Sequence, residues 1–201
     1  MYRLLPLCAL AVLLAACDPS SSGVPAAEID GKPKPFDWPQ WQGPDRTAAS
    51  HETGLLPQWP AGGPPLAWKV KALGGGYSAP SVAAGRILGM SYRGKEEGVW
   101  ALDEATGKEL WWTRIADAAK IGYGEGSRCT PTVDGERLYA LGVSGDLVCL
   151  QVGDGRELWR KNLVRDFGGT LPYYRQSYGY TESPLIDGDR VVVTPGEPGH
   201  T

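Results

Sequence analysis

The sequence predicts an all-β protein made of repeated four-stranded antiparallel units, and three observations lead to this prediction. Glycine and proline are abundant, with 28 and 17 among 201 residues, which is typical of a chain with many tight turns. Apolar residues fall in short runs bounded by turn residues, and no stretch of useful length has a 3.6-residue apolar period. One sequence pattern also recurs at intervals of about fifty residues.

The clearest repeated motif has ten residues and ends in tryptophan. Residues 102–111 read LDEATGKELW, and residues 150–159 read LQVGDGRELW, 48 positions later. A second motif precedes each copy and contains a proline, at Pro80, Pro131 and Pro184. Three copies of the proline motif at similar intervals indicate repeated structural units rather than chance similarity.

The second unit divides into four short strands separated by turn signals. The expected strands are Cys129–Val133, Arg137–Val143, Asp146–Leu150 and Glu157–Leu163. An antiparallel unit of four strands that repeats every 40–50 residues or so is typical of a β-propeller blade. The chain supplies two whole units and the start of a third, whereas closed propellers need about four to eight. We therefore expect residues 37–201 to form an incomplete β-propeller of two to three blades.

Tryptophan and glycine have defined places in this expected blade. Gly107 and Gly155 fall in the turn before the last strand, where a positive φ is expected. Trp111 and Trp159 follow on that strand, where a large flat ring can wedge between neighbouring blades. Trp68 lies in the sequence LAWKV, which resembles an outer strand without its own blade. We expect this segment to close the ring by completing the last blade.

The first residues resemble an export signal. Arg3 precedes a short apolar run at residues 4–16, which is too short to cross a bilayer and fits the apolar region of a secretory signal. The run ends at residues 14–17, LAAC, which resemble the bacterial lipobox. This resemblance implies that residues 1–16 are removed and that Cys17 carries a lipid. A plain signal peptide with an incidental cysteine is the alternative.

The expected lipid anchor places the protein outside the cytoplasm. Residues 17–36 are small, polar and rich in proline, so we expect a flexible tether between the lipid and the propeller. The protein is then exported and faces the periplasm, and the sequence leaves open which bacterial membrane holds it. The net charge of −3 indicates no nucleic-acid partner.

Two cysteines lie in the body of the chain, at Cys129 and Cys149. They fall on the first and third strands of one expected blade, which places them about 9–10 Å apart. A disulfide needs Cα atoms within about 7 Å, so we expect two free thiols that are mostly buried. The chain contains no H-E-x-x-H, C-x-x-C, P-loop or G-x-S-x-G motif, and we assign no catalytic residue.

The segment ALDEATGKELWW resembles the repeat of pyrroloquinoline-quinone (PQQ)-like, quinoprotein-type β-propellers. Two groups share that repeat: the quinoprotein dehydrogenases and the lipid-anchored propeller of the outer-membrane protein assembly machinery. Residues 37–44 and 56–60 resemble the opening segment of uncharacterised proteins of this type, and residues 179–189 resemble the start of their third blade. The resemblance covers residues 37–201, and it is specific for the fold and weak for function.

Two regions are candidates for recognition. Glu182 is expected on an innermost strand near the central channel, where its carboxylate could bind a cation or the quinone; a carboxylate that is solvated or paired with arginine is the alternative. The connection before the third unit carries Tyr173, Tyr174, Arg175 and Tyr178. These residue types are typical of recognition surfaces, and a loop folded over the blade edge is the alternative.

The sequence favours a non-catalytic binding or scaffold module of the cell envelope, with a membrane anchor, an envelope protein as partner and no cofactor. The alternative is a PQQ-dependent dehydrogenase. The resemblance implies that such an enzyme holds Ca²⁺ with carboxylate and amide oxygens, uses an aspartate base and sandwiches the quinone between flat groups. Those residues would then lie in blades beyond the present sequence.

Overall fold

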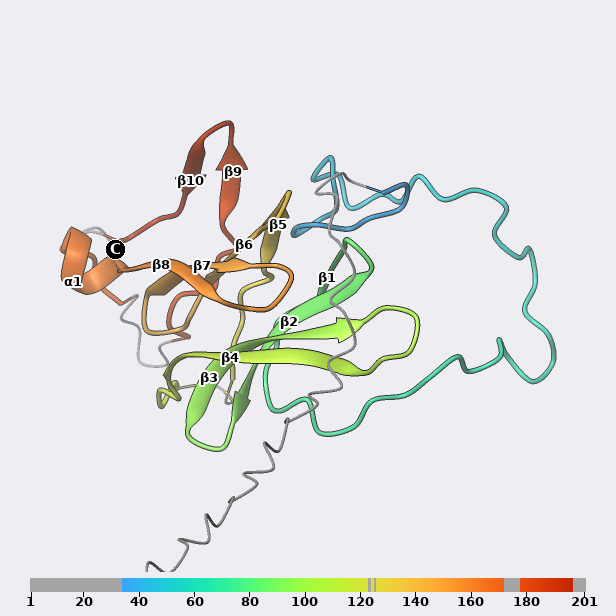
Figure 1. The fold of residues 1–201 in the computed structure, drawn as a ribbon, viewed down its shortest axis with the longest axis horizontal. Helices are drawn as coiled ribbons and strands as arrows, with labels where there is room; N and C mark the ends of the chain where they lie inside the picture. Colours follow the sequence, from blue (N-terminus) through green and yellow to red (C-terminus); the bar gives the residue numbers. More distant parts are fainter. Residues whose placement is uncertain (1–33, 123, 125, 172–177, 197–201) are drawn as a thin grey trace, which may run out of the picture.

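A computed structural model describes residues 34–122, 124, 126–171 and 178–196 (Figure 1). The first antiparallel sheet, which we call blade 1, consists of β1 (Ser81–Ala83), β2 (Arg86–Arg93), β3 (Glu96–Asp103) and β4 (Glu109–Asp117), in this spatial order. The second sheet, blade 2, consists of β5 (Thr132–Asp134), β6 (Arg137–Leu141), β7 (Asp146–Gln151) and β8 (Glu157–Asn162). A hairpin of β9 (Leu185–Asp187) and β10 (Arg190–Val192) follows. The prediction of four-stranded antiparallel blades in an incomplete propeller is confirmed.

Blade 2 differs from its predicted strands at five boundaries, and the ends of β5 and β7 each move by a single residue. Its first strand starts at Thr132 rather than Cys129, and its second ends at Leu141 rather than Val143. Its last strand ends at Asn162, because the side chain of this residue caps a one-turn helix, α1 (Leu163–Phe167), by accepting hydrogen bonds from two backbone N–H groups of that helix. The sequence pattern did not predict this helix.

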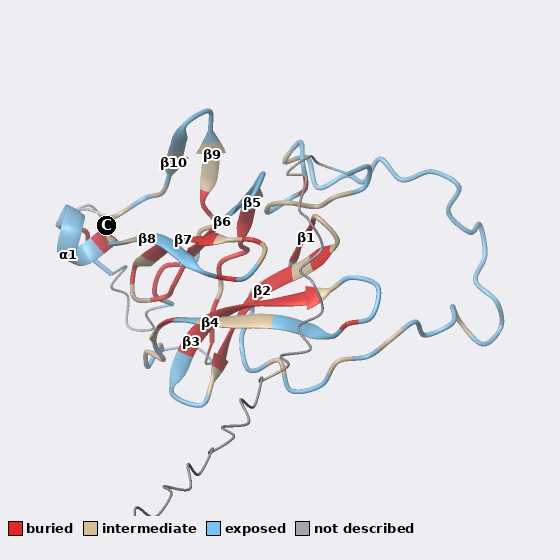
Figure 2. Cartoon of the chain, viewed as in Figure 1, coloured by how far each residue is buried: buried red, intermediate tan, exposed pale blue. Residues whose placement is uncertain are grey.

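The core lies between the two sheets. Figure 2 shows that the buried residues concentrate on the central strands of each blade, whereas β8 and α1 are largely exposed. Central strands that are covered on both faces read as continuous apolar runs, as in DLVCLQ of β7. The largest fully buried apolar side chains belong to both blades: Leu88, Leu102, Ile115, Leu138, Leu141 and Leu150.

The inner strands of successive blades are joined by one repeated contact, which we call the inner seam. The hydroxyl of Ser81 donates to the carbonyl of Pro131. The hydroxyl of Thr132 donates to the carbonyl of Pro184 at 2.6 Å. Both donors occupy the position directly after the repeated proline. The same hydrogen bond therefore ties blade 1 to blade 2 and blade 2 to the hairpin β9–β10.

The outer edges of blades 1 and 2 are joined by Trp111 of β4. Its indole N–H donates to the carbonyl of Val152 at 3.0 Å. Its ring covers Gly155, where a Cβ atom would lie 2.5 Å from the ring. Gly155 also has a φ of 72°, so a side chain is disfavoured there both by space and by backbone geometry. We call this contact the outer seam.

Trp68 makes the same contact with blade 1. Its indole N–H donates to the carbonyl of Glu104 at 3.0 Å, and its ring covers Gly107, whose φ is 69°. In the described part of the chain, residues 66–70 do not pair with another strand. Trp68 thus occupies the position of an outer-strand tryptophan, although its segment is not hydrogen-bonded to a neighbouring strand in the described part of the chain. Ring closure by this segment stays a prediction.

Trp159 is the third member of the series. Its side chain lies on β8, its ring centroid is 6.0 Å from that of Tyr139, and it is 36% exposed. The described residues contain no further turn of the Gly107 and Gly155 type for it to cover. Tryptophan is therefore in two environments. Trp111 packs on the glycine turn of the next blade, whereas Trp159 has no such turn beside it among the described residues.

Candidate binding surfaces

Three side chains from successive inter-blade connections meet at one place. The guanidinium carbon of Arg128 lies 4.7 Å from the ring centroid of Tyr77 and 5.2 Å from that of Tyr178. A cation over an aromatic face at this distance is attracted by the ring quadrupole. Tyr77 is 59% exposed and Tyr178 is 44% exposed, so both rings also face solvent. We call these three residues the aromatic–arginine cluster.

The backbone around this cluster is held by contacts between connections. The backbone N–H of Tyr77 donates to the carbonyl of Ser127 at 2.8 Å, beside a parallel bridge between Gly76 and Ser127. A Cβ atom on Gly124 would lie 2.6 Å from the hydroxyl oxygen of Tyr77. The cluster therefore sits where two connections pass close to one another.

The structure brings together some of the residues that the sequence singled out. Tyr178 belongs to the aromatic–arginine cluster, whereas Tyr173, Tyr174 and Arg175 lie outside the described residues. Sequence reasoning missed Tyr77 and Arg128. A usable signal was their position, since each directly precedes the inner-strand motif of its own unit.

Glu182 has a backbone partner. Its Oε1 atom accepts a hydrogen bond from the backbone N–H of Thr194 at 2.6 Å. It borders a small cavity of about 190 Å³ with Tyr180, Thr194 and neighbouring residues. Within the described residues no group of three His, Cys, Asp or Glu side chains could hold a metal ion. A role for Glu182 in holding a cation or quinone stays a prediction.

Glu97 is the one fully buried carboxylate in the described part of the chain. It lies on β3 of blade 1 and accepts a hydrogen bond from the backbone N–H of Val143 in blade 2, with its Oε2 atom at 3.1 Å. Burial raises the pKa of Glu97 to about 7, although the Val143 N–H opposes the rise. The carboxyl group therefore changes its charge near neutral pH while it bridges two blades.

Cys129 and Cys149 are both buried and free, as predicted. Burial raises the pKa of the Cys129 thiol to about 12 and raises the pKa of the Cys149 thiol in the same direction. A thiol becomes a nucleophile or a metal ligand only as the thiolate. Both cysteines therefore act as small packing groups in this fold.

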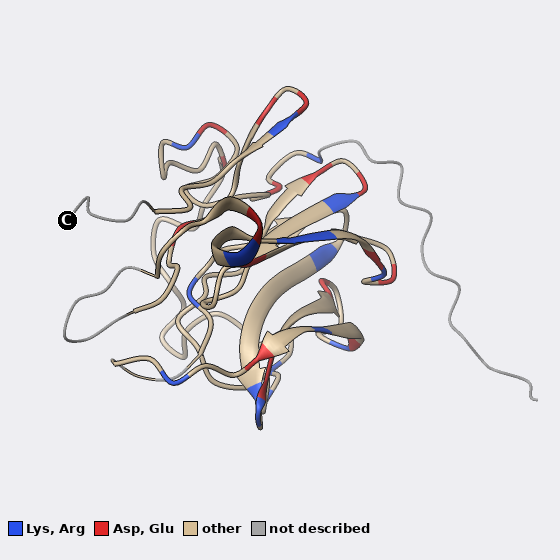
Figure 3. Ribbon diagram, turned by 90° about the vertical axis from the view of Figure 1, so that its left-hand side faces the viewer, with Lys and Arg blue, Asp and Glu red and all other residues tan. Residues whose placement is uncertain are grey.

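Charged side chains are mixed rather than segregated. Figure 3 shows acidic and basic residues interspersed along the turns and strand edges. Several form exposed pairs across or along strands, such as Arg114 with Glu96 and Arg160 with Glu157.

Among the described residues no helix is long and apolar enough to cross a membrane.

The repeated blades and their seams have a counterpart among known protein families. The family described as outer membrane protein assembly factor BamB has a sequence model that matches residues 43–196. The chain belongs to this PQQ-like repeat family. The seams made by the tryptophans and by the residues after the repeated prolines lie inside the part of the chain that the BamB family model covers.

Solved structures show the same fold. The chain is similar to quinohemoprotein alcohol dehydrogenase from Comamonas testosteroni, with a TM-score of 0.53 and 22% identity over 77% of this chain and 22% of that chain. It is also similar to BamB from Moraxella catarrhalis, with a TM-score of 0.44 and 13% identity over 59% of this chain and 34% of that chain. The chain thus spans a minor part of each. The likeness to the dehydrogenase shows the fold alone. No curated protein matches the chain.

Proposed function

We propose that this chain is part of a cell-envelope propeller that binds another protein and acts as a scaffold rather than as a catalyst. The observation that carries the proposal is the aromatic–arginine cluster, in which two exposed tyrosine rings flank an arginine. Tyrosine and arginine are enriched at the energetic centres of protein interfaces because they bury large areas and keep a polar end. The assembly role in the description of the family supports an envelope partner.

The anchor is part of the same proposal. Residues 1–16 act as the signal peptide, Cys17 carries the lipid and residues 17–36 tether the propeller of residues 37–201 on the periplasmic side. Signal and attachment site lie outside the described residues. Mass spectrometry of the mature protein tests this assignment, since a diacylated or triacylated N-terminal Cys17 is expected. An unmodified N-terminus elsewhere would contradict it.

The partner surface is tested by site-specific photo-crosslinking in cells that produce the full-length protein. A crosslinking residue at position 178 should trap one envelope protein, and the same residue at Phe167, which is exposed on α1, should not. Tyr77→Ala and the triple change of Tyr173, Tyr174 and Arg175 to Ala should weaken the crosslink. Equal products from positions 178 and 167 would show that the surface is wrongly assigned.

A PQQ-dependent dehydrogenase is the second candidate, since the fold is similar to that of a quinohemoprotein alcohol dehydrogenase. Among the described residues one oxygen of Glu182 is engaged by Thr194, and no group of three His, Cys, Asp or Glu side chains could hold a metal ion. We therefore derive no reaction step from them. Full-length protein supplied with PQQ and Ca²⁺ should reduce no dye in the presence of alcohols, and dye reduction would replace the scaffold proposal.

A further inference from the structure

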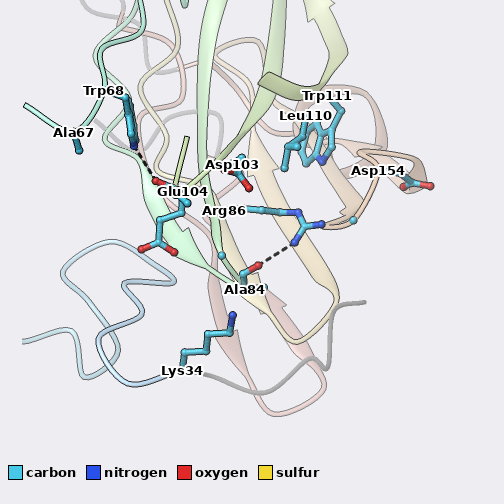
Figure 4. Close-up of a pocket in the computed structure, with 13 residues that line it drawn as sticks. Lys34, Ala67, Trp68, Ala84, Arg86, Asp103, Glu104, Leu110, Trp111 and Asp154 are labelled. Carbon is cyan, nitrogen blue, oxygen red and sulfur yellow. Dashed lines mark hydrogen bonds between the residues drawn. The ribbon is translucent and has the colours of Figure 1, made fainter. Parts of the chain in front are cut away.

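A cavity of about 850 Å³ opens at the outer side of blades 1 and 2 (Figure 4). Its walls come from the segment of Trp68, the β1–β2 turn, the β3–β4 turn, the start of β4 and the β7–β8 turn of blade 2. The side chains that matter for its chemistry are those of Lys34, Trp68, Arg86, Asp103, Trp111 and Asp154. It lies away from the aromatic–arginine cluster, and none of that cluster's residues lines it.

The most unusual group in this cavity is Arg86, the first residue of β2. It is 4% exposed, and its Nη1 atom donates to the carbonyl of Ala84 at 2.9 Å. Its Nε atom has no hydrogen-bond partner among the described residues. The strand register places Arg86 opposite Asp103, and the two charges attract each other, although no ion pair between them is found among the described residues. A buried donor without a partner is costly unless something else satisfies it.

The repeat itself does not require a buried arginine at this position. Arg137 begins β6 in the same register of blade 2, opposite Gln151, and is exposed. Arg190 begins β10 in the hairpin and is also exposed. Arg86 therefore differs from its equivalents in its burial, and Figure 4 shows its side chain extending below Trp111 among the residues that line the cavity.

The polar groups of the cavity are of both signs. Arg86 and Lys34 supply donors, while Asp103, Glu104 and Asp154 supply acceptors. A simple anion or cation would meet like charge on one side of the cavity. Hydroxyl groups donate and accept, so a ligand with several hydroxyls satisfies both sets at once.

The apolar walls of the cavity include two indole rings. Trp68 and Trp111 are fixed by hydrogen bonds from their N–H groups to backbone carbonyls and by glycines that cover one part of each ring. Rings that are already positioned lose little freedom when a ligand binds. Flat apolar rings beside a few polar groups are the usual composition of a small-molecule site. We propose that this cavity binds a saccharide, with the apolar face of a sugar ring on an indole and its hydroxyls on Arg86 and Asp154.

Calorimetric titration of the intact protein with maltotetraose and chitotetraose tests the proposal. At least one of the two should bind. Arg86→Gln and Asp154→Asn should each weaken that binding by about tenfold, since a hydrogen bond to a charged group is lost. The Asp154→Asn change is a mild one, because the amide keeps the oxygen that accepts from the backbone N–H of Arg156. Arg137→Gln is the matched control and should leave the dissociation constant unchanged.

Three results would overturn the proposal. Absence of heat with both saccharides, or equal weakening by Arg86→Gln and Arg137→Gln, would overturn the proposal. A glycine–serine peptide of similar mass that binds where neither saccharide does would assign the cavity to another class of ligand and also overturn it. Saccharide binding does not depend on the proposed partner surface, so Tyr178→Ala should leave it intact.

Discussion

Blade 1 meets blade 2 at both the inner and the outer seam, whereas blade 2 and the hairpin β9–β10 share the inner seam and, among the described residues, have no tryptophan contact of the outer-seam kind. Ser81 and Thr132 make the same hydroxyl-to-carbonyl hydrogen bond at the two inner seams. At the outer edge Trp111 covers Gly155, while Trp159 is 36% exposed. The inner seam needs only the first residues of the next unit. The outer seam needs that unit to extend as far as its glycine turn.

The largest expected effect distinguishes the two tryptophans. Trp111→Ala should lower the free energy of unfolding by about 3 kcal/mol, because it removes a half-buried ring and the hydrogen bond to Val152. Trp159→Ala should lower it by about 1 kcal/mol, since this ring is 36% exposed and covers no glycine turn among the described residues. Urea unfolding followed by circular dichroism measures both. Equal losses would mean that the outer seam adds nothing to blade packing.

A second test separates close packing from backbone strain. Gly155→Ala should cost about 2–3 kcal/mol, because its Cβ would lie 2.5 Å from the Trp111 ring at a φ of 72°. Gly168→Ala is the matched control, since Gly168 has a φ of 68° and nothing within 4 Å of the added Cβ. It should cost about 1 kcal/mol from strain alone. Identical unfolding midpoints would show that the ring moves aside freely.

Glu97 makes the contact between blades 1 and 2 dependent on pH. Its pKa is raised to about 7 in the folded protein, so between pH 4.5 and 7 the folded chain binds more protons than the unfolded chain. The contribution of Glu97 to stability is therefore greatest at acidic pH and should fall by up to about 1.4 kcal/mol per pH unit through this window. Glu97→Gln should remove this slope in urea unfolding series. A slope that survives the substitution would assign it to other groups.

The smallest expected effect concerns the inner seams. Ser81→Ala and Thr132→Val each remove one hydroxyl donor, and each should cost about 1 kcal/mol. The two losses should be similar, because the contact is the same at both seams. Hydrogen exchange at the backbone amides of β1 and β5 locates the effect. A much larger loss at Thr132 would show that the hairpin β9–β10 depends on this bond alone.

The repeat is readable from the sequence because its strands are short and bounded by turn residues. The ten-residue motif by itself locates Trp111, Trp159 and the glycine turns that precede them. The short helix α1 is not predictable in the same way, since one turn carries no periodic signal and depends on the cap at Asn162.

The sequence does not predict which residues of different units contact one another. Glu97 follows another glutamate next to a turn, which reads as an exposed position, but contacts with blade 2, such as the hydrogen bond from Val143, bury it. The cluster of Tyr77, Arg128 and Tyr178 joins residues about fifty positions apart. Only Tyr178 stands out in the sequence, because it lies in a connection rich in aromatic residues. Arg86 likewise resembles its equivalents until its burial is known.

The tryptophan contact points in one direction along the chain, and this has a consequence for biosynthesis. Trp68 covers a turn of blade 1, and Trp111 covers a turn of blade 2, so each ring precedes its glycine in the order of translation. Under the proposed export the chain enters the periplasm from its N-terminal end, so each ring arrives there before its partner turn. Blades can thus dock in the order in which they are made. Until the partner turn arrives, the indole at the edge stays exposed, and exposed apolar surface of this kind favours misassembly.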